Sequence, residues 1–166
     1  MTNNISENFK SIYKLDNVNL EGGNRLKKET YDQPKPLITI ITATFNSEKH
    51  LEECFLSLHS QKFSDYEHII IDGNSTDKTI DIIKKYDEKI AYWCSSQDKG
   101  IYDAFNKGMQ LARGKYIGFL NSDDQYAVDA FLNLNKYIKD FPEKDFIFGA
   151  VQKHWGTLYG YKPFKI

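Results

Sequence analysis

Two adjacent carboxylates stand out among the residues that could do chemistry. Asp123 and Asp124 close the segment 121–124, directly after the short apolar run 116–120. Two such groups at the end of a buried strand repel each other and lose hydration, so they need a compensating cation. Carboxylate oxygens suit Mg²⁺ or Mn²⁺, which also bind a substrate's phosphates. A structural alternative is that both acids cap a helix expected near 128–139 and favour its dipole.

A third carboxylate, Asp72, ends another apolar run, 66–72, and is expected to point into the same crevice. An acid at this place can accept hydrogen bonds from a base or a ribose hydroxyl, as in dinucleotide-binding folds. The Ser, Thr and Asp at 75–77 are explained fully by the start of a helix. The sequence has neither GxGxxG after the first strand nor GxxxxGK[ST]. A metal ion and Lys99 would therefore have to offset the charge of any bound phosphates.

Other side chains give weaker signals. The four histidines show no metal-ligand spacing and are expected at the surface or in the core; they are His50, His59, His68 and His154. Phe45 could stack on a base, although simple packing explains it equally well. No GxSxG segment is present, so a nucleophilic serine elbow is not predicted.

Composition limits the classes of protein that remain. The 166 residues include 22 Lys+Arg and 23 Asp+Glu, so a net charge of −1 gives no long-range attraction to nucleic acid. The two cysteines, Cys54 and Cys94, are interpreted as buried thiols in a reducing compartment. No apolar run approaches the roughly 18 residues of a membrane span, and the N-terminus lacks signal-peptide order. We expect a cytoplasmic protein of one main domain, without a nucleic-acid partner.

The chain divides into three segments. Residues 1–34 are polar with scattered apolar positions and are interpreted as a partly disordered or loosely docked extension; a docking helix for a partner or a membrane surface is the alternative. Residues 35–151 form the expected domain. Residues 152–166 show no clear period and read as the start of an incomplete segment.

Strand and helix patterns alternate through the domain. Strands are expected at 37–44, 66–72, 90–95, 116–120 and 146–151. Helices are expected after the first two strands, at 101–113 with Gly114 as the C′ residue, and near 128–139. The first of these helices is expected to place four side chains on one face: Leu51, Cys54, Phe55 and Leu58. This order predicts an α/β fold, with a Rossmann-like, mostly parallel sheet and helices on both faces. Ligands of such sheets bind at the carboxyl ends of the strands, where the polar and acidic residues gather.

Five segments occur in an order and spacing that resemble the family 2 glycosyltransferases of the GT-A fold. They are residues 36–46, 57–63, 67–79, 98–108 and 118–124. The resemblance covers about residues 36–151. It implies a nucleotide-diphosphate-sugar donor, with a UDP-sugar expected, a divalent metal (Mn²⁺ or Mg²⁺) and inversion at the anomeric carbon.

The resemblance also implies roles for particular residues. Thr44 would lie against the nucleotide and Asp72 near the uracil or ribose. Asp98 and Lys99 would border the ribose and diphosphate. The segment Asn121-Ser122-Asp123 occupies the family's Asp-x-Asp position, with Asp123 as metal ligand. Two departures stand out: Asn121 replaces the usual first acid, and Gly73 stands where many members have a second acid.

Family members usually continue into an acceptor-binding half that carries the catalytic base. Residues 152–166 contain no Asp or Glu, so the base is expected beyond Ile166. General-base catalysis is worth about 10²–10⁴-fold. We therefore expect the donor-binding part of a glycosyltransferase of surface-polysaccharide synthesis, with a glycan or lipid-linked acceptor and a peripheral contact with the inner face of the plasma membrane. The alternatives are a nucleotide-sugar-binding module without turnover, or a nucleotidyltransferase, which would need a glycine-rich loop after the first strand.

Overall fold

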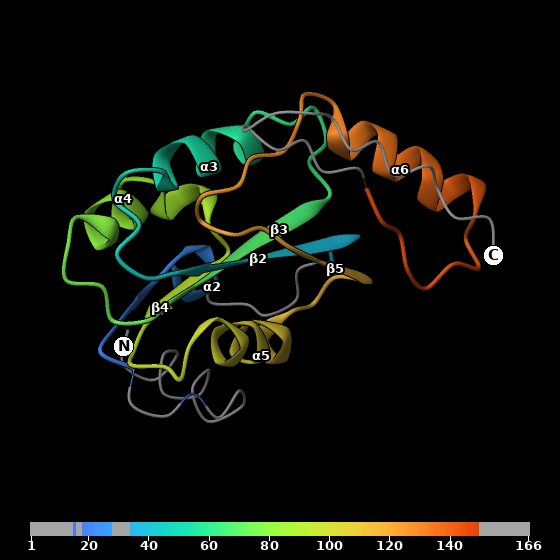
Figure 1. Cartoon of the computed structure of the whole chain (residues 1–166). Coiled ribbons are helices and arrows are strands. Elements are labelled where there is room, and N and C mark those ends of the chain that lie inside the picture. Colours follow the sequence, from blue (N-terminus) through green and yellow to red (C-terminus); the bar gives the residue numbers. More distant parts are fainter. Residues whose placement is uncertain (1–14, 16–17, 28–33, 150–166) are drawn as a thin grey trace.

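The computed structural model describes residues 15, 18–27 and 34–149, which fold around one five-stranded sheet (Figure 1). The strands are β1 (Leu20–Gly22), β2 (Ile38–Thr44), β3 (Tyr66–Asp72), β4 (Tyr92–Ser95) and β5 (Tyr116–Phe119). The helices are α2 (Asn24–Lys27), α3 (Leu51–His59), α4 (Thr79–Lys85), α5 (Ile101–Leu111) and α6 (Ala130–Asp140), with a 3₁₀ turn η1 (Asp87–Lys89). The predicted α/β class is confirmed.

The strand order is β1-β4-β3-β2-β5, and β2 to β5 run parallel. Every residue of β2 is buried, as expected for a β-branched strand that is covered on both faces. β3 and β4 follow on one side of β2, whereas β5 lies on the other side. The strand order therefore reverses between β2 and β5, which is where open α/β sheets bind ligands.

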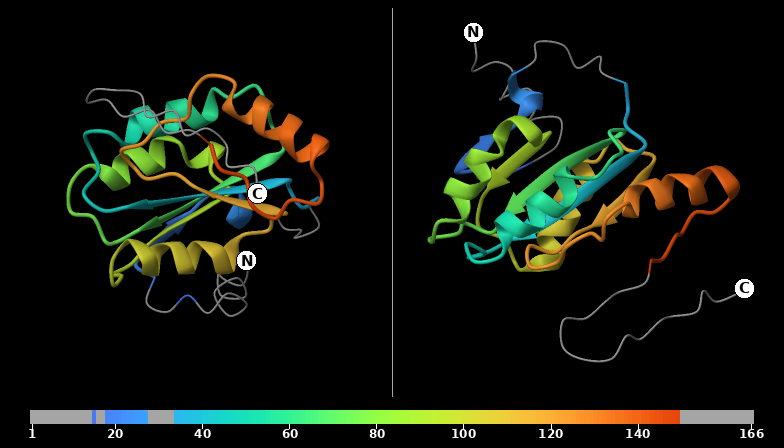
Figure 2. Two further views of the ribbon diagram at one scale, coloured as in Figure 1. Left: turned by 45° about the vertical axis from the view of Figure 1, so that its right-hand side comes forward. Right: turned by 90° about the horizontal axis from the view of Figure 1, so that it is seen from above.

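Helices cover both faces of the sheet. α3, α4 and α6 lie on one face and α5 on the other (Figures 1 and 2). α3 buries the four side chains predicted for its inner face, Leu51, Cys54, Phe55 and Leu58. These pack with residues of α4 and α6 in one core cluster, and α5 contributes to a second cluster on the opposite face. Both cysteines are buried and free, as expected.

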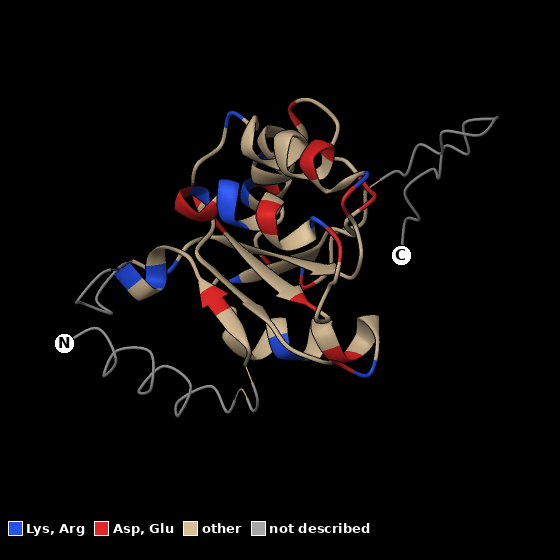
Figure 3. Ribbon diagram, turned by 90° about the vertical axis from the view of Figure 1, so that its left-hand side faces the viewer, with Lys and Arg blue, Asp and Glu red and all other residues tan. Residues whose placement is uncertain are grey.

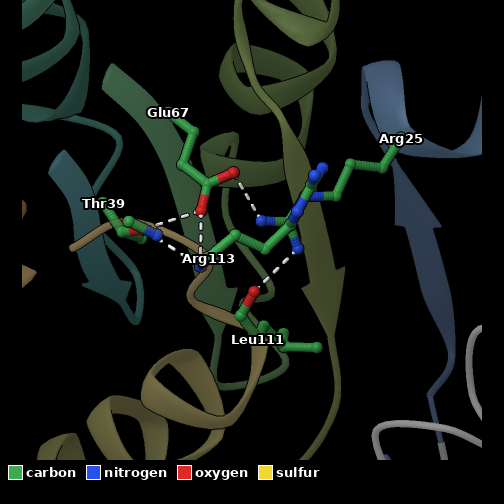
Figure 4. A network of polar contacts seen from close by, with 6 residues as sticks. Arg25, Thr39, Glu67, Leu111 and Arg113 are labelled. Atoms are coloured by element: carbon green, nitrogen blue, oxygen red, sulfur yellow. Dashed lines mark hydrogen bonds and ion pairs between the residues drawn. The ribbon is translucent and has the colours of Figure 1, made fainter. Parts of the chain in front are cut away.

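Part of the segment interpreted as an extension packs on the domain: residues 20–22 join the sheet as β1, and residues 24–27 form α2. β1 pairs antiparallel with β4, and Arg25 of α2 reaches Glu67 in β3 (Figure 4). The Glu67 carboxylate accepts hydrogen bonds from Arg25 Nη2 at 2.6 Å, Thr39 Oγ1 at 2.7 Å and the Arg113 amide at 2.9 Å. The Arg25 and Glu67 side chains are only 7% and 9% exposed. A buried ion pair therefore ties this segment to the amino-terminal half of β2 and β3.

Two expected features are wrong. Residues 146–149 form no strand, and Phe146 and Phe148 are 80% and 91% exposed; residues 150 and 151 of that expected strand lie outside the described residues. A strand needs a hydrogen-bonding neighbour, and residues 146–149 are not paired with the sheet. Gly114 is not the C′ residue of α5, because the helix ends at Leu111 and Ala112 is extended. The Gly114 amide instead donates to Thr39 Oγ1 at 2.8 Å. A Cβ at position 114 would collide with the Thr39 backbone.

Candidate functional site

A hollow of about 290 Å³ lies where the strand order reverses, at the carboxyl edge of the sheet. Its lining comes from the loops after β2 and β5: Phe45, Asn46, Ser47, His50, Ser122 and Asp123. The hollow opens because β5 pairs only up to Phe119, opposite Ile41, while β2 continues to Thr44. Figure 3 views the molecule from the side on which the loops after β2, β3 and β4 lie; acidic and basic positions are interspersed there.

The loop after β2 is held by the loop after β3. The Asn46 amide donates to Ser75 Oγ at 2.8 Å, and Asn46 Oδ1 accepts from the Thr76 amide at 2.9 Å. The Glu48 amide donates to Asp77 Oδ2 at 3.1 Å. Asn46 takes a left-handed φ of 49°, which asparagine adopts more readily than most residues. These bonds give the wall of the hollow a defined backbone conformation.

Asp72 lies beneath these loops. Asp72 is fully buried, so the expectation that its side chain points into the crevice is wrong. Oδ1 accepts from Thr44 Oγ1 at 2.9 Å and Ser75 Oγ at 2.5 Å, and Oδ2 accepts from the Ser75 amide at 2.9 Å and Ser95 Oγ at 2.7 Å. A buried carboxylate needs such donors, and they come from the ends of β2 and β4 and from the loop after β3. Asp72 thus joins three carboxyl ends of the sheet.

The loop after β5 forms the other wall. Ser122 Oγ and Ser47 Oγ lie 2.8 Å apart in a hydrogen bond, and Cys54 Sγ of α3 donates to the Asn121 carbonyl at 3.4 Å. Burial, together with Asp124 and Asp123, raises the pKa of the Cys54 thiol to about 12, so it remains a neutral donor. α3 therefore anchors this loop at the side of the hollow.

Three polar side chains of this loop, Asn121, Asp123 and Asp124, differ in their surroundings. Asn121 Nδ2 donates to Asp124 Oδ2 at 2.9 Å, so these two side chains hold each other. Asp123 is exposed and lines the hollow, and Asp124 is exposed but is absent from the lining. The structure thus separates the adjacent acids into one carboxylate at the hollow and one bonded to Asn121.

Asp98 and Lys99 lie in the loop after β4, outside the lining of the hollow. Asp98 packs over Gly73: a Cβ built on that glycine would lie 2.9 Å from Asp98 Oδ2. Asp98 Oδ1 accepts from the Gly100 amide at 2.8 Å. Lys99 is exposed, and its amide donates to Asp103 Oδ2 at 3.2 Å. The carboxylate of Asp98 therefore occupies space beside position 73, where the expected second acid is missing.

Asp123 gives the hollow one carboxylate of the kind that a hard divalent cation can share with a ligand. Within residues 15, 18–27 and 34–149, no group of three or more His, Cys, Asp or Glu side chains is arranged to hold a metal. Mg²⁺ and similar ions are often held by one or two carboxylates plus substrate phosphates. Asp123 supplies one such carboxylate at the hollow, and Asp124 is its sequence neighbour.

Like Asn46 and Ser47, His50 lines the hollow although the sequence did not mark it as a binding residue. It is the N-cap of α3, and neither its spacing nor a motif marks it. Its place in the lining depends on how the loop after β2 turns into α3, and the fold alone reveals this. The only sequence feature that could have pointed to His50 is its position between the end of a predicted strand and the start of a predicted helix.

The site and fold together define an α/β protein with a hollow at its topological switch point. Comparison with known proteins gives its family. The sequence model of the domain "Glycosyl transferase family 2" matches residues 39–164, so the chain belongs to this family.

Relatives agree with this assignment. A PGL/p-HBAD biosynthesis glycosyltransferase of Mycobacterium tuberculosis is 32% identical over 120 residues, which are 70% of this chain and 47% of that protein. The putative teichuronic acid biosynthesis glycosyltransferase TuaG of Bacillus subtilis is 37% identical over 98 residues, 57% of this chain and 39% of that protein. The chain thus spans less than half the length of these relatives.

Solved structures share the fold. TarS 1–349 of S. aureus in complex with UDP-GlcNAc matches with a TM-score of 0.58 and 29% identity, over 63% of this chain and 32% of that one. The mannosyltransferase PcManGT of Pyrobaculum calidifontis, in complex with GDP-Man and Mn²⁺, matches with a TM-score of 0.57 over 82% of this chain and 40% of that one. At 16% identity, the second likeness concerns the fold alone. None of the helices in the described ranges has the length and apolar character needed to traverse a bilayer.

Proposed function

We propose that this chain is the donor-binding part of a glycosyltransferase that uses a nucleotide-diphosphate sugar. The observation that carries the proposal is the hollow at the switch point, with the Asp123 carboxylate in its lining, in a chain of glycosyl transferase family 2. The complex of TarS with UDP-GlcNAc supports a UDP-sugar as the donor.

The reaction is a substitution at the anomeric carbon of the sugar. An acceptor hydroxyl oxygen forms a bond to that carbon, and the bond from the carbon to the diphosphate oxygen breaks. The hydroxyl proton passes to a general base, and the nucleoside diphosphate leaves with the bonding electron pair. A single displacement of this kind inverts the configuration. We place the base beyond Ile166, in the part that faces the acceptor.

A divalent ion, Mn²⁺ or Mg²⁺, would neutralise charge on the departing diphosphate. Asp123 would hold it from the hollow, with Asp124 as the neighbouring carboxylate. The Asn121 amide, which now bonds Asp124, would be available to a ribose hydroxyl. The place of Asp123 in the lining of the hollow supports its role as the metal ligand, and in the bound state Asn121 would exchange its hydrogen bond to Asp124 for one to the ribose.

The nucleoside would lie along the loops after β3 and β4. The Asp98 carboxylate packs beside position 73 and would meet the base or ribose, with Lys99 beside the diphosphate. Thr44 and Asp72 would act indirectly, because their hydrogen bonds fix the loops that would contact the nucleoside.

We propose a glycan or lipid-linked acceptor in cell-surface polysaccharide synthesis. The protein would work on the cytoplasmic side of the membrane, with a peripheral membrane contact. The names of the relatives, which refer to PGL/p-HBAD and teichuronic acid biosynthesis, support a cell-surface product.

Calorimetry tests the proposal. The protein is titrated with UDP-sugars and GDP-sugars, with and without Mn²⁺. We expect binding of at least one donor that Mn²⁺ strengthens, and Asp123→Ala to weaken it by at least about tenfold while removing the response to metal. Asp140→Ala, an exposed acid at the end of α6, is the matched control and should bind as the wild type does. Binding of no donor, or binding indifferent to Mn²⁺ and to Asp123→Ala, would overturn the proposal.

A further inference from the structure

His50 lines the same hollow as Asp123, which is the only acid among the lining residues. The six lining residues comprise Asp123, four uncharged side chains and this histidine. His50 is therefore the lining side chain that can carry a positive charge. Lys99, to which the sequence assigned that role, lies in the loop after β4 and is absent from the lining.

The imidazole of His50 is exposed, and the hydrogen bonds of the residue are made by its main chain. The His50 amide donates to the Ser47 carbonyl at 3.2 Å, and its carbonyl accepts from the Cys54 amide at 3.1 Å. No ring hydrogen bond joins His50 to another part of the described chain, so those residues leave both ring nitrogens available to a ligand. His50 is also the N-cap residue of α3 by position, without a side-chain capping hydrogen bond, and the N-terminal amides of this nine-residue helix favour anions.

We infer that His50 is a diphosphate-binding residue of the donor site, an inference that rests on the proposed function. Imidazole nitrogen donates hydrogen bonds to phosphate oxygens, and a charge-assisted bond is the stronger kind. Hard ions such as Mg²⁺ and Mn²⁺ prefer carboxylate and phosphate oxygens to imidazole. Asp123 would therefore hold the metal and His50 the phosphate oxygens, from the loops after β5 and β2 that line the hollow.

The substitution can be made without touching the backbone that shapes the wall. Both hydrogen bonds of His50 involve main-chain atoms, so His50→Ala keeps them. His50→Lys restores a cation of different geometry. Lys49→Ala is the matched control, since Lys49 is an exposed neighbour that can carry a charge but does not line the hollow.

The test is a comparison of ligands that differ in their phosphates. Titrations with UDP-sugar and UDP are made by calorimetry in the presence of Mn²⁺, and uridine binding is followed by ligand-observed NMR; the guanine series replaces these if the wild type selects it. We expect His50→Ala to weaken both diphosphates about tenfold and to leave the nucleoside unchanged. His50→Lys should recover part of the loss, and Lys49→Ala should match the wild type.

The outcomes separate this inference from the proposed function. A wild type that binds no donor refutes the proposed function itself. A wild type that binds, with His50→Ala equal to it, refutes only the role of His50. An equal loss in Lys49→Ala would show a general effect of charge, and an equal loss for uridine would show a contact with the nucleoside; either result overturns the inference. Circular dichroism melting of each variant confirms that the fold is intact.

Discussion

Asp72 offers the sharpest test of how the carboxyl edge is built. We predict that Asp72→Asn lowers the free energy of unfolding by about 2–3 kcal/mol, although it changes neither size nor shape. The carboxylate accepts four hydrogen bonds in a fully buried place, and an asparagine offers one oxygen and one NH₂ group. The substitution therefore turns half of the acceptor positions into donors.

The size of this loss depends on which of the groups that donate to Asp72 can instead accept a hydrogen bond. If the NH₂ group replaces Oδ2, the Ser75 amide loses its partner and cannot rotate, which costs about 1–3 kcal/mol. If it replaces Oδ1, the hydroxyls of Thr44 and Ser75 can turn and accept instead. The second arrangement is cheaper, but every remaining bond loses the charge that strengthens it by roughly twofold. Asp72→Ala removes all the acceptors and leaves a void, so it should cost about 3–5 kcal/mol.

Urea denaturation followed by circular dichroism measures both variants. Asp81→Ala is the control, because that acid is exposed on α4, and it should stay within about 0.5 kcal/mol of the wild type. We expect Asp72→Asn also to weaken donor binding, since the loops after β2 and β3 lose their common anchor. Asp72→Asn with the stability of the wild type would refute the reasoning, as would an alanine variant more stable than the asparagine one.

Two further predictions concern buried polar groups away from the hollow. Burial lowers the pKa of His59 to about 4 and that of His68 well below its usual range, so both rings are neutral in the fold and the unfolded chain binds more protons below about pH 6.5. The contribution of the two neutral rings to stability is therefore complete above that pH. The free energy of unfolding, measured by urea denaturation, should fall by about 1–2 kcal/mol between about pH 6.5 and about pH 5.5. A His59→Phe, His68→Phe double variant should lose this pH dependence, and an unchanged pH dependence would contradict the assignment. Glu67→Ala should destabilise the protein by about 3–5 kcal/mol, because it leaves the Arg25 guanidinium buried without its carboxylate. In a double-mutant cycle with Arg25→Met, additive losses would show that the ion pair contributes nothing.

Local pattern was sufficient for the central part of the fold. The β-branched run ending at Thr44 is buried along its whole length, and the alternation of strands and helices left few topologies besides a parallel sheet. The inner face of α3 followed from its period of three and four residues. β1 could not be predicted, since its three residues carry no strand pattern and are extended because β4 pairs with them. Residues 146–149 had a strand pattern and formed none, because a pattern does not supply a partner.

The composition of the strand ends determined that polar and acidic residues would meet at one edge of the sheet, since parallel strands place their carboxyl ends together. Tertiary structure decided how deep each of them lies. Asp72 is covered because the loop after β3 folds back and donates to it, while Asp123 stays exposed because β5 ends short of β2. His50 reaches the hollow through the turn into α3. Residue type sets what a side chain can bind, but long-range pairing and loop hydrogen bonds set whether a ligand can reach it.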